Sequence, residues 1–515
     1  MEKQSRTKAV IVNSSFAVIA QFLNLFLSFI VRTLLIKLLG SEVNGLNGLF
    51  SNIVNILSFA ELGIGSAISY SLYKPLAEGD RVQVAAIMAL FKRVYNGVAA
   101  FIALVGILLS FFVQVFIHGS TGSVGNVQVA FLLFIANVVF SYMMSYKRTL
   151  LIANQQGYVD SLNRMIFTFG SQTLQIIGLL ILPDYYIFLI IQALSTIVSN
   201  LPIIGRVNRE FPYLSEMKNN SVKSETVLYL KKNVAGMLSF KVGNIVIVGT
   251  DNIILSSFLG LHAVGMYANY TLIITGLVSL LNSVVNAITS SIGNLANGGN
   301  PVKERQVFLQ FNMVNALLSF AVALGLIILF PFFISAWLGK YFVLSNFITL
   351  IIVINFFVGQ LRNGLINYLN AYGLYWQQRY KSVIEATMNL VVSLILVMFT
   401  PLGIAGVLLG TLSSYLLVDF IWEPRIVVKH AIKLNIIAFY IYYGSQIILG
   451  IFLFGLVQQF AAAINLEKQT LFTALPESAM LMLLGTIVFH GFQIGVSKFV
   501  NLDSGSIFTL IKRYR

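Results

Sequence analysis

Residues 38–45 read LLGSEVNG, and residues 258–265 read FLGLHAVG. At the same shift of 220 positions, SAIS at 66–69 meets NAIT at 286–289, and GD at 79–80 meets GN at 299–300. A looser match joins residues 147–157 to residues 362–372 at a shift near 215. Several matches at a nearly constant shift indicate that the chain contains two copies of one structural unit.

The composition predicts that both copies lie in a membrane. Hydrophobic residues make up 57% of the chain, charged residues only 10%, and the mean hydropathy is +0.86. A soluble domain carries about 25% charged residues. The apolar blocks are long enough for transmembrane helices, whereas a barrel would show alternating segments of roughly ten residues. The expected fold class is therefore an all-α polytopic membrane protein.

Apolar runs between turn signals predict fourteen transmembrane helices, each able to cross roughly 30 Å of hydrocarbon. The first follows Lys3, Arg6 and Lys8, as a signal peptide would, but it runs on to about Leu39 without a small-residue cleavage site. We therefore expect it to be retained. The predicted spans lie near residues 10–39, 44–71, 84–117, 127–152, 158–182, 186–206, 233–259, 263–295, 306–336, 343–371, 378–400, 402–428, 435–460 and 470–498.

The distribution of Lys and Arg gives an independent test of this count. The connections placed outside hold only Lys340 and Lys468, while Arg32, Lys37 and Lys241 lie within helices. The other 28 of the 33 cationic residues fall at the termini, in the alternate loops or in the helix ends beside them. The positive-inside rule then predicts that both termini are cytoplasmic. It also accounts for the net charge of +15 without a nucleic-acid partner.

Helix one corresponds to helix seven, so an even number of helices separates the two copies. They should have the same orientation and be related by a pseudo-two-fold axis along the membrane normal. Two parallel six-helix bundles around a cavity are the plan of a transporter. The predicted domains are the N-terminal bundle at 1–207, a cytoplasmic linker at 208–232, the C-terminal bundle at 233–430, and helices thirteen and fourteen with a tail at 431–515.

The residues that most enzymes and metal proteins need are scarce. The absence of cysteine excludes disulfides, thiol catalysis and Cys-ligated metals. The four histidines are far apart, so we predict no metal site. The longest loop is basic and holds no carboxylate cluster, and no Asp-x-Asp motif occurs. We therefore predict no catalytic residues, and a membrane polysaccharide polymerase or glycosyltransferase is the out-of-class alternative.

Several short motifs resemble Wzx-type polysaccharide transporters. They are FIVR at 29–32 followed by LLG at 38–40, ELG at 61–63, and KPLAEGD at 74–80. That family belongs to the multidrug/oligosaccharidyl-lipid/polysaccharide (MOP) exporter superfamily, which also contains the MATE drug exporters and the lipid II flippase MurJ. The resemblance covers the topology of the whole chain and the motifs of helices one, two and four. Many Wzx members have twelve helices, and the extra pair here resembles MurJ and Gram-positive exopolysaccharide relatives.

The resemblance implies a flippase of the bacterial plasma membrane. Its substrate would be an undecaprenyl-pyrophosphate-linked oligosaccharide, moved from the inner to the outer leaflet by alternating access for capsule, O-antigen or exopolysaccharide assembly. Membrane lipid and a coupling ion, H⁺ or Na⁺, are the other expected partners, and no cofactor is expected. A MATE-like cation-coupled exporter of small organic molecules is the alternative. It would need an acidic cavity, whereas the intramembrane charges here are mixed.

A pyrophosphate group needs cations away from water, and charged residues inside spans are costly, about 2.5–3.5 kcal/mol each. Arg32 is the strongest candidate, because a guanidinium binds phosphate oxygens bidentately. Lys241 and Lys37 are further candidates. Snorkelling is the alternative for all three, and a structural ion pair is a second alternative for Arg32. The repeat places Asp251 beside the counterpart of Arg32, so we expect a gating ion pair between the two, with a static pair or a proton site as alternatives.

Two intramembrane carboxylates, Glu61 and Glu385, are candidates for ion coupling. Lys381 lies one helical turn before Glu385, so a simple ion pair is the alternative there. Asp419 and Glu423 lie close to the predicted cytoplasmic end of helix twelve, and we expect both to be solvated.

Two further groups complete the candidate site. Basic residues at the predicted inner mouths could form a cytoplasmic vestibule for the headgroup or could serve as topology signals only: Lys147, Arg148, Arg164, Arg362, Arg379 and Lys381, with Lys92 and Arg93 nearby. Polar residues that could contact sugars are Asn24, Asn52, Asn55, Tyr267, Asn269 and Tyr270.

Overall fold

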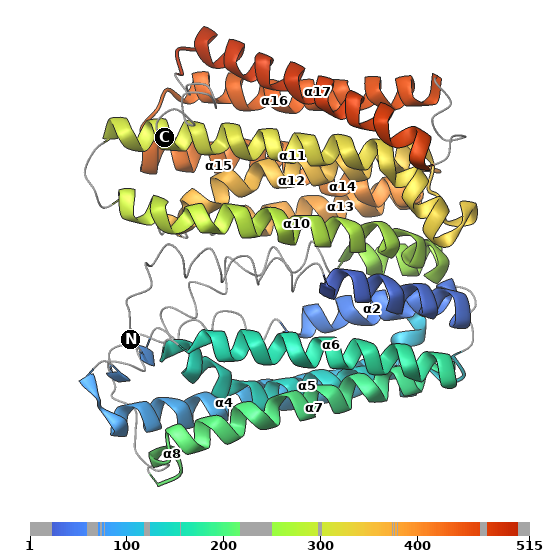
Figure 1. The fold of residues 1–515 in the computed structure, drawn as a ribbon, viewed down its shortest axis with the longest axis vertical. Coiled ribbons are helices and arrows are strands. Elements are labelled where there is room, and N and C mark those ends of the chain that lie inside the picture. Colours follow the sequence, from blue (N-terminus) through green and yellow to red (C-terminus); the bar gives the residue numbers. More distant parts are fainter. Residues whose placement is uncertain are drawn as a thin grey trace. The chain divides into compact units, whose positions relative to one another are not determined.

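The computed structural model describes residues 23–58, 71–72, 75–76, 78–117, 124–154, 156–216, 250–296, 301–372, 374, 376–378, 380–463 and 471–502 (Figure 1). All regular structure in these ranges is helical. The chain divides into two compact units, Met1–Gly265 and Met266–Arg515. The bundle and linker boundaries expected from the sequence stay predictions.

Four long helices lie alongside one another in the first unit (Figure 1). They are α4 (Arg81–Ser110), α5 (Val127–Ala153), α6 (Gly157–Ile181) and α7 (Tyr185–Glu210). The same unit contains helical residues 23–34, the π-helical turn η1 (Leu35–Leu39), α2 (Ser41–Leu57), the 3₁₀ turn η3 (Val113–Phe116), the short α8 (Tyr213–Glu216) and helical residues 250–259.

Short polar side chains set the first residues of three of these helices. Asp80 accepts a hydrogen bond from the backbone N–H of Gln83 at the start of α4, and Asn126 and Asp184 accept equivalent bonds at the starts of α5 and α7. Such caps satisfy N–H groups that have no partner inside the helix. The caps therefore fix the first residue of each helix. They thereby also fix the position of each later polar residue along the helix axis.

The repeated glycines share one geometry. Gly40 and Gly260 both have positive φ, 100° and 84°, and each ends a helical turn just before the next helix begins. The following helices α2 and α10 (Leu261–Ala296) meet at Gly45 and Gly265. A Cβ on Gly45 would lie 2.2 Å from the carbonyl oxygen of Leu261, and one on Gly265 would lie 2.5 Å from that of Ser41. Only glycine allows so close a backbone approach.

The second unit continues α10 and adds a bundle closed by two C-terminal helices. Its elements are α11 (Pro301–Leu338), η4 (Lys340–Phe342), α12 (Asn346–Ala371), η5 (Trp376–Gln378), α13 (Lys381–Phe399), α14 (Ile404–Ser414), the π-helical turn η6 (Tyr415–Asp419), α15 (Phe420–Ile426), the π-helical turn η7 (Val427–Ile432), α16 (Ile436–Ala463) and α17 (Leu471–Phe499).

An aromatic cluster attaches the C-terminal pair to the bundle. Phe320 on α11 stacks on Phe489 of α17 with ring centroids 4.1 Å apart and on Phe454 of α16 at 5.2 Å. Phe357 of α12 packs edge-on against both C-terminal rings. All four rings are fully enclosed, so the extra helix pair is an integral part of the second unit.

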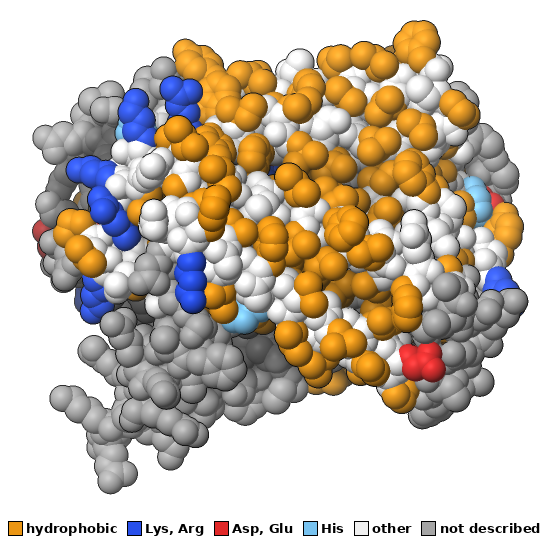
Figure 2. Space-filling model, turned by 90° about the horizontal axis from the view of Figure 1, so that it is seen from above, with side chains coloured by type: hydrophobic (Ala, Val, Ile, Leu, Met, Phe, Trp, Pro, Cys, Tyr) orange, Lys and Arg blue, Asp and Glu red, His pale blue; other side chains and the backbone are white. Residues whose placement is uncertain are grey.

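Eleven described helices are long and apolar enough to cross a membrane. They match eleven of the fourteen predicted spans, and the other three fall partly on residues 1–22, 59–70 and 217–249, which lie outside the described ranges. On the face drawn in Figure 2, hydrophobic side chains cover the middle and most of the Lys and Arg side chains gather at one end. The chain is a multi-pass membrane protein.

Candidate functional site

A polar pocket of about 360 Å³ lies between α5, α6 and α7. All three helices are candidate membrane spans. The lining is polar apart from Phe167 and, among the described residues, contains no carboxylate: Ser141, Ser145, Arg148, Arg164, Thr168, Ser171, Gln172, Gln175, Gln192, Ser195, Thr196, Ser199 and Asn200. We call this the polar pocket.

The helical repeat brings these side chains to one place. On α6, Arg164, Thr168, Ser171 and Gln175 are three or four residues apart, which places them along one face. Facing outward on the same helix are apolar side chains such as Ile166 and Leu174. A run of hydroxyl and amide groups inside a membrane protein is costly to leave without partners, so a shared polar interior is its favourable place.

The buried Arg148 closes the inner wall of the pocket. Its guanidinium donates to Asn200 Oδ1 at 2.9 Å and Asn163 Oδ1 at 3.1 Å, and it is 2.5 Å from Asp160 Oδ1. The second carboxylate oxygen of Asp160 accepts from Arg164 Nε at 2.8 Å. Two arginines thus flank one carboxylate. Arg148 is 7% exposed and fixes three helices to one another, whereas the Arg164 side chain is 65% exposed and lines the opening.

The first helix contacts the pocket residue Gln172 of α6. The amide nitrogen of Gln172 donates to Asn24 Oδ1 at 3.0 Å and Ser28 Oγ at 2.8 Å. The amide oxygen of Gln172 is enclosed and has no hydrogen-bond partner within the described part of the chain. Arg32 lies one turn beyond Ser28 on the same face and is half-buried. The predicted sugar contact Asn24 therefore accepts a hydrogen bond from a residue of the pocket lining, and Arg32 lies further along the same helix.

A separate basic cleft of about 690 Å³ lies between α4, α5 and the end of α7, on another face of α5. Its lining is Ala85, Met88, Ala89, Lys92, Arg93, Asn96, Tyr146, Lys147, Asn208, Phe211, Pro212 and Leu214. Lys147 Nζ donates to Asn208 Oδ1 at 2.5 Å. Arg81 lies over the ring of the adjacent Tyr213. Burial raises the pKa of the Tyr213 phenol and outweighs the opposing effect of Arg81, so this group adds no negative charge near the cleft at neutral pH.

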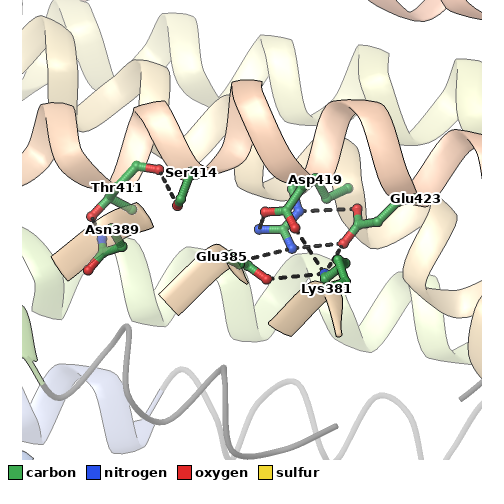
Figure 3. Close-up of polar contacts among 8 residues, drawn as sticks. Lys381, Glu385, Asn389, Thr411, Ser414, Asp419 and Glu423 are labelled. Atoms are coloured by element: carbon green, nitrogen blue, oxygen red, sulfur yellow. Dashed lines mark hydrogen bonds and ion pairs between the residues drawn. The ribbon is translucent and has the colours of Figure 1, made fainter. Parts of the chain in front are cut away.

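The second unit holds a buried ion cluster (Figure 3). Arg362 on α12 contacts Asp419 at 2.9 Å, Glu423 at 2.8 Å and Glu385 at 3.3 Å. Lys381 on α13 contacts the same three carboxylates at 2.9, 2.6 and 3.2 Å. Two cations therefore face three acids, and the formal charge of the cluster is −1 when all five groups are ionised. Charges this deep are stable only when paired in this way.

The cluster changes several expectations for the second copy. The predicted ion pair between Lys381 and Glu385 is confirmed. The expectation that Asp419 and Glu423 are solvated is wrong, because both are fully buried. Arg362 and Lys381 are 7% and 3% exposed, so they bind carboxylates inside the bundle and do not face an open vestibule.

The other predicted residues lie in varied surroundings. Lys37 and Asn55 are exposed, Asp251 is 9% exposed, and Asn52 donates to its own helix at Gly48 O. Tyr267 is half-buried and Asn269 fully buried. The fully buried Tyr270 hydroxyl accepts from the backbone of Leu344. Tyr270 is therefore part of the core of the second unit. Lys241, Glu61 and Arg379 lie outside the described residues.

Sequence reasoning missed most of the polar pocket. Its Ser, Thr and Gln residues carry no charge, and hydropathy averaged over a span conceals them. The spacing of Thr168, Ser171 and Gln175 on one face of a predicted helix was the available signal.

The solved structures most similar to this chain include a MATE transporter and a lipid II flippase. An inward-facing MATE multidrug transporter of the MOP superfamily has a TM-score of 0.60 at 14% identity, covering 81% of this chain and 96% of the transporter. The lipid II flippase MurJ in an inward closed conformation has a TM-score of 0.60 at 15% identity, covering 94% of this chain and 99% of MurJ. The chain has the MATE/MurJ fold. A MATE protein in complex with MaD3S shares this fold, with a TM-score of 0.55 at 14% identity over 82% of this chain and 96% of that protein. No protein-family model matches the sequence, and the comparison with curated proteins gives no match.

Proposed function

We propose that this protein is a flippase for a lipid-linked oligosaccharide, with undecaprenyl pyrophosphate as the lipid carrier, in a bacterial plasma membrane. The polar pocket is the observation that carries the proposal. We propose transport by alternating access. The translocated oligosaccharide would serve capsule, O-antigen or exopolysaccharide assembly.

The chemistry of the polar pocket suits a sugar. Sugars present many hydroxyl groups, each able to donate and accept, and the pocket offers hydroxyls and amides that do both. The amide oxygen of Gln172 is an enclosed acceptor that a sugar hydroxyl would satisfy. A volume near 360 Å³ is at the small end of ligand sites, which fits one or two sugar units.

The arginines near the pocket suit the anionic part of such a substrate. Arg164 lines the opening, and Arg32 lies on the helix face that carries Asn24 and Ser28. In this proposal the pyrophosphate passes from Arg164 toward Arg32, with Lys37 and Lys241 as further contacts and Asp251 as the residue that pairs with Arg32 between cycles. Glu61 and Glu385 stay the proposed ion-coupling residues. The ion pairs of Glu385 with Arg362 and Lys381 make Glu61 the better candidate of the two.

A MATE-like exporter of organic cations is less well supported. A cationic drug needs an uncompensated carboxylate or an aromatic surface, and the described lining of the polar pocket has neither beyond Phe167. The carboxylate of Asp160 contacts two residues of the pocket lining, Arg148 and Arg164, and is held between them.

Translocation of undecaprenyl-pyrophosphate-oligosaccharide in proteoliposomes tests the proposal. We expect wild type to flip the substrate, the double variant Thr168→Val/Gln172→Leu to flip it at least about tenfold more slowly, and Arg32→Ala and Lys241→Ala to lose most activity. Thr173→Val is the matched control, because Thr173 lies on the same helix but is exposed away from the pocket. A wild-type protein that moves no lipid-linked sugar but expels ethidium would overturn the proposal in favour of a drug exporter.

A further inference from the structure

The basic cleft has features of a second ligand site. Lys92, Arg93 and Lys147 line it together with the amides of Asn96 and Asn208. Among the described residues that line it there is no carboxylate. Three cations gathered in one hollow repel one another, so the hollow is favourable for a ligand that brings negative charge.

The cleft is separated from the polar pocket by α5. Ser145 and Arg148 line the polar pocket, whereas Tyr146 and Lys147, between them in the sequence, line the cleft. Successive residues of a helix point about 100° apart, so the two sites lie on different faces of one helix. A ligand in the cleft would therefore not occupy the polar pocket.

Both sites hold α5 against α7 through adjacent residues. In the cleft Lys147 bonds Asn208, and in the polar pocket Arg148 bonds Asn200, two turns earlier on α7. An anion that draws Lys147 toward itself competes directly with the Asn208 amide oxygen. The contact between α5 and α7 beside the Arg148 clamp would then change.

The lining of the cleft favours one kind of anion, a phosphate that carries an apolar group. Ala85, Met88, Phe211 and Leu214 give it an apolar side, and the cations lie toward the exposed edge. A phosphate oxygen accepts several short charge-assisted hydrogen bonds from Lys and Arg at once. An apolar group attached to that phosphate would fill the remaining wall.

We propose that the basic cleft binds the phosphate group of an effector that is not transported, and that this binding acts on the polar pocket through α5 and α7. The source of the phosphate is either an anionic phospholipid of the adjoining leaflet or a soluble phosphorylated compound. The inference goes beyond the proposed function, because it requires no particular transport substrate.

Binding to the purified full-length chain tests the site without any transport assay. Inorganic pyrophosphate is titrated calorimetrically into protein in a neutral detergent, and lipid retention is followed by mass spectrometry after exchange into nanodiscs of phosphatidylcholine with or without phosphatidylglycerol. We expect wild type to bind one of the two probes. The triple variant Lys92→Gln/Arg93→Gln/Lys147→Gln should bind it at least about tenfold more weakly. Binding of pyrophosphate identifies a soluble ligand, and selective retention of phosphatidylglycerol identifies a lipid.

A charge-matched triple variant is the control. Arg425, Lys429 and Lys498 are exposed residues of the second unit, and their change to Gln removes the same charge elsewhere. Equal weakening in both triple variants would reduce the effect to net charge and overturn the proposal, as would a wild type that binds neither probe. Thermal unfolding of each variant shows whether it is folded, and the single variant Lys147→Gln gives the same comparison if the triple variant is not. Loss of binding with intact flipping, or the reverse, separates this proposal from the proposed function.

Discussion

In the predicted repeat, Arg362 on α12 aligns with Lys147, the residue before Arg148 on α5. Arg148 binds Asp160 of α6 and Asn200 of α7, while Arg362 binds Glu385 of α13 and the acids of the following helix. Each arginine thus joins the fourth, fifth and sixth helices of its copy. The partners differ, because Arg148 has one carboxylate and two side-chain amides around it and lines a pocket, whereas Arg362 has three carboxylates around it.

The ion cluster predicts which single substitutions destabilise the protein more and which less. Arg362→Gln leaves Lys381 to neutralise three carboxylates, and we expect a loss of about 3–5 kcal/mol in stability. Asp419→Asn leaves two cations facing two acids, so its cost should be clearly smaller. Thermal unfolding in one detergent measures both, with Arg425→Gln on the exposed side of α15 as the control. Equal stability of the Arg362 variant and wild type would mean that the cluster contributes nothing to the fold.

At the same scale, local spacing predicted part of this cluster and missed the rest. Lys381 and Glu385 are one turn apart, so their pairing was visible in the sequence. Asp419 and Glu423 were placed near water because the apolar run was expected to end at residue 428. The helical path continues through η7 to Ile432, which keeps both acids inside the bundle. Their partners come from helices far apart in the sequence, and spacing gives no information on such contacts.

Among the elements, helix pairs show how glycine and aromatic residues set the distance between spans. Small residues let membrane helices approach closely, because packing replaces the hydrophobic effect inside lipid. The crossing of α2 and α10 is of this kind, with Asn44 Nδ2 donating to Gly265 O at 3.2 Å. The repeat in the sequence predicted that these two helices correspond, but it did not predict that they touch.

Adding one methyl group at this crossing should disturb it. Gly45→Ala and Gly265→Ala place a Cβ within 2.2–2.5 Å of a backbone oxygen, so the helices must separate. We expect each variant to unfold at a lower temperature and at least one to lose transport. Gly97→Ala on α4 is the control, because nothing lies within 4 Å of its new Cβ, and it should be neutral or slightly stabilising. Two fully stable crossing variants would show that this contact is not tight in the membrane.

The attachment of α16 and α17 gives a second prediction for elements. Phe489→Ala removes a fully enclosed ring that stacks on Phe320, and a loss of about 3–5 kcal/mol is expected. Phe499→Ala on the same helix removes a ring that is 83% exposed and should change stability little. Limited proteolysis of the two variants compares them, and faster release of the C-terminal pair is expected only for Phe489→Ala. Equal cleavage would mean that the pair is held by other contacts.

For the whole molecule, composition and charge predicted more than any motif did. The apolar runs predicted the span limits well because lipid requires each span to be long and apolar, whatever its partners are. Most of the eleven described spans begin and end close to the predicted positions. The polar pocket depends on which faces of three spans turn toward one another, and hydropathy does not encode that. The sequence therefore did not predict that the polar pocket lies in the first unit, and only the structure shows it.

The orientation of the whole chain is the remaining prediction, and the absence of cysteine makes it directly testable. The charge distribution places Lys340 outside and Lys429 inside, and both side chains are exposed. Single substitutions Lys340→Cys and Lys429→Cys should then differ in intact cells. A membrane-impermeant maleimide should label the first at once and the second only after the membrane is opened, with the cysteine-free parent as a blank. The reverse pattern would mean that the predicted orientation is wrong. The basic cleft would then lie outside, and a cytoplasmic effector could not reach it. Labelling as predicted would instead support a cytoplasmic position for the cleft and for the opening near Arg164, the side from which the proposed substrate starts.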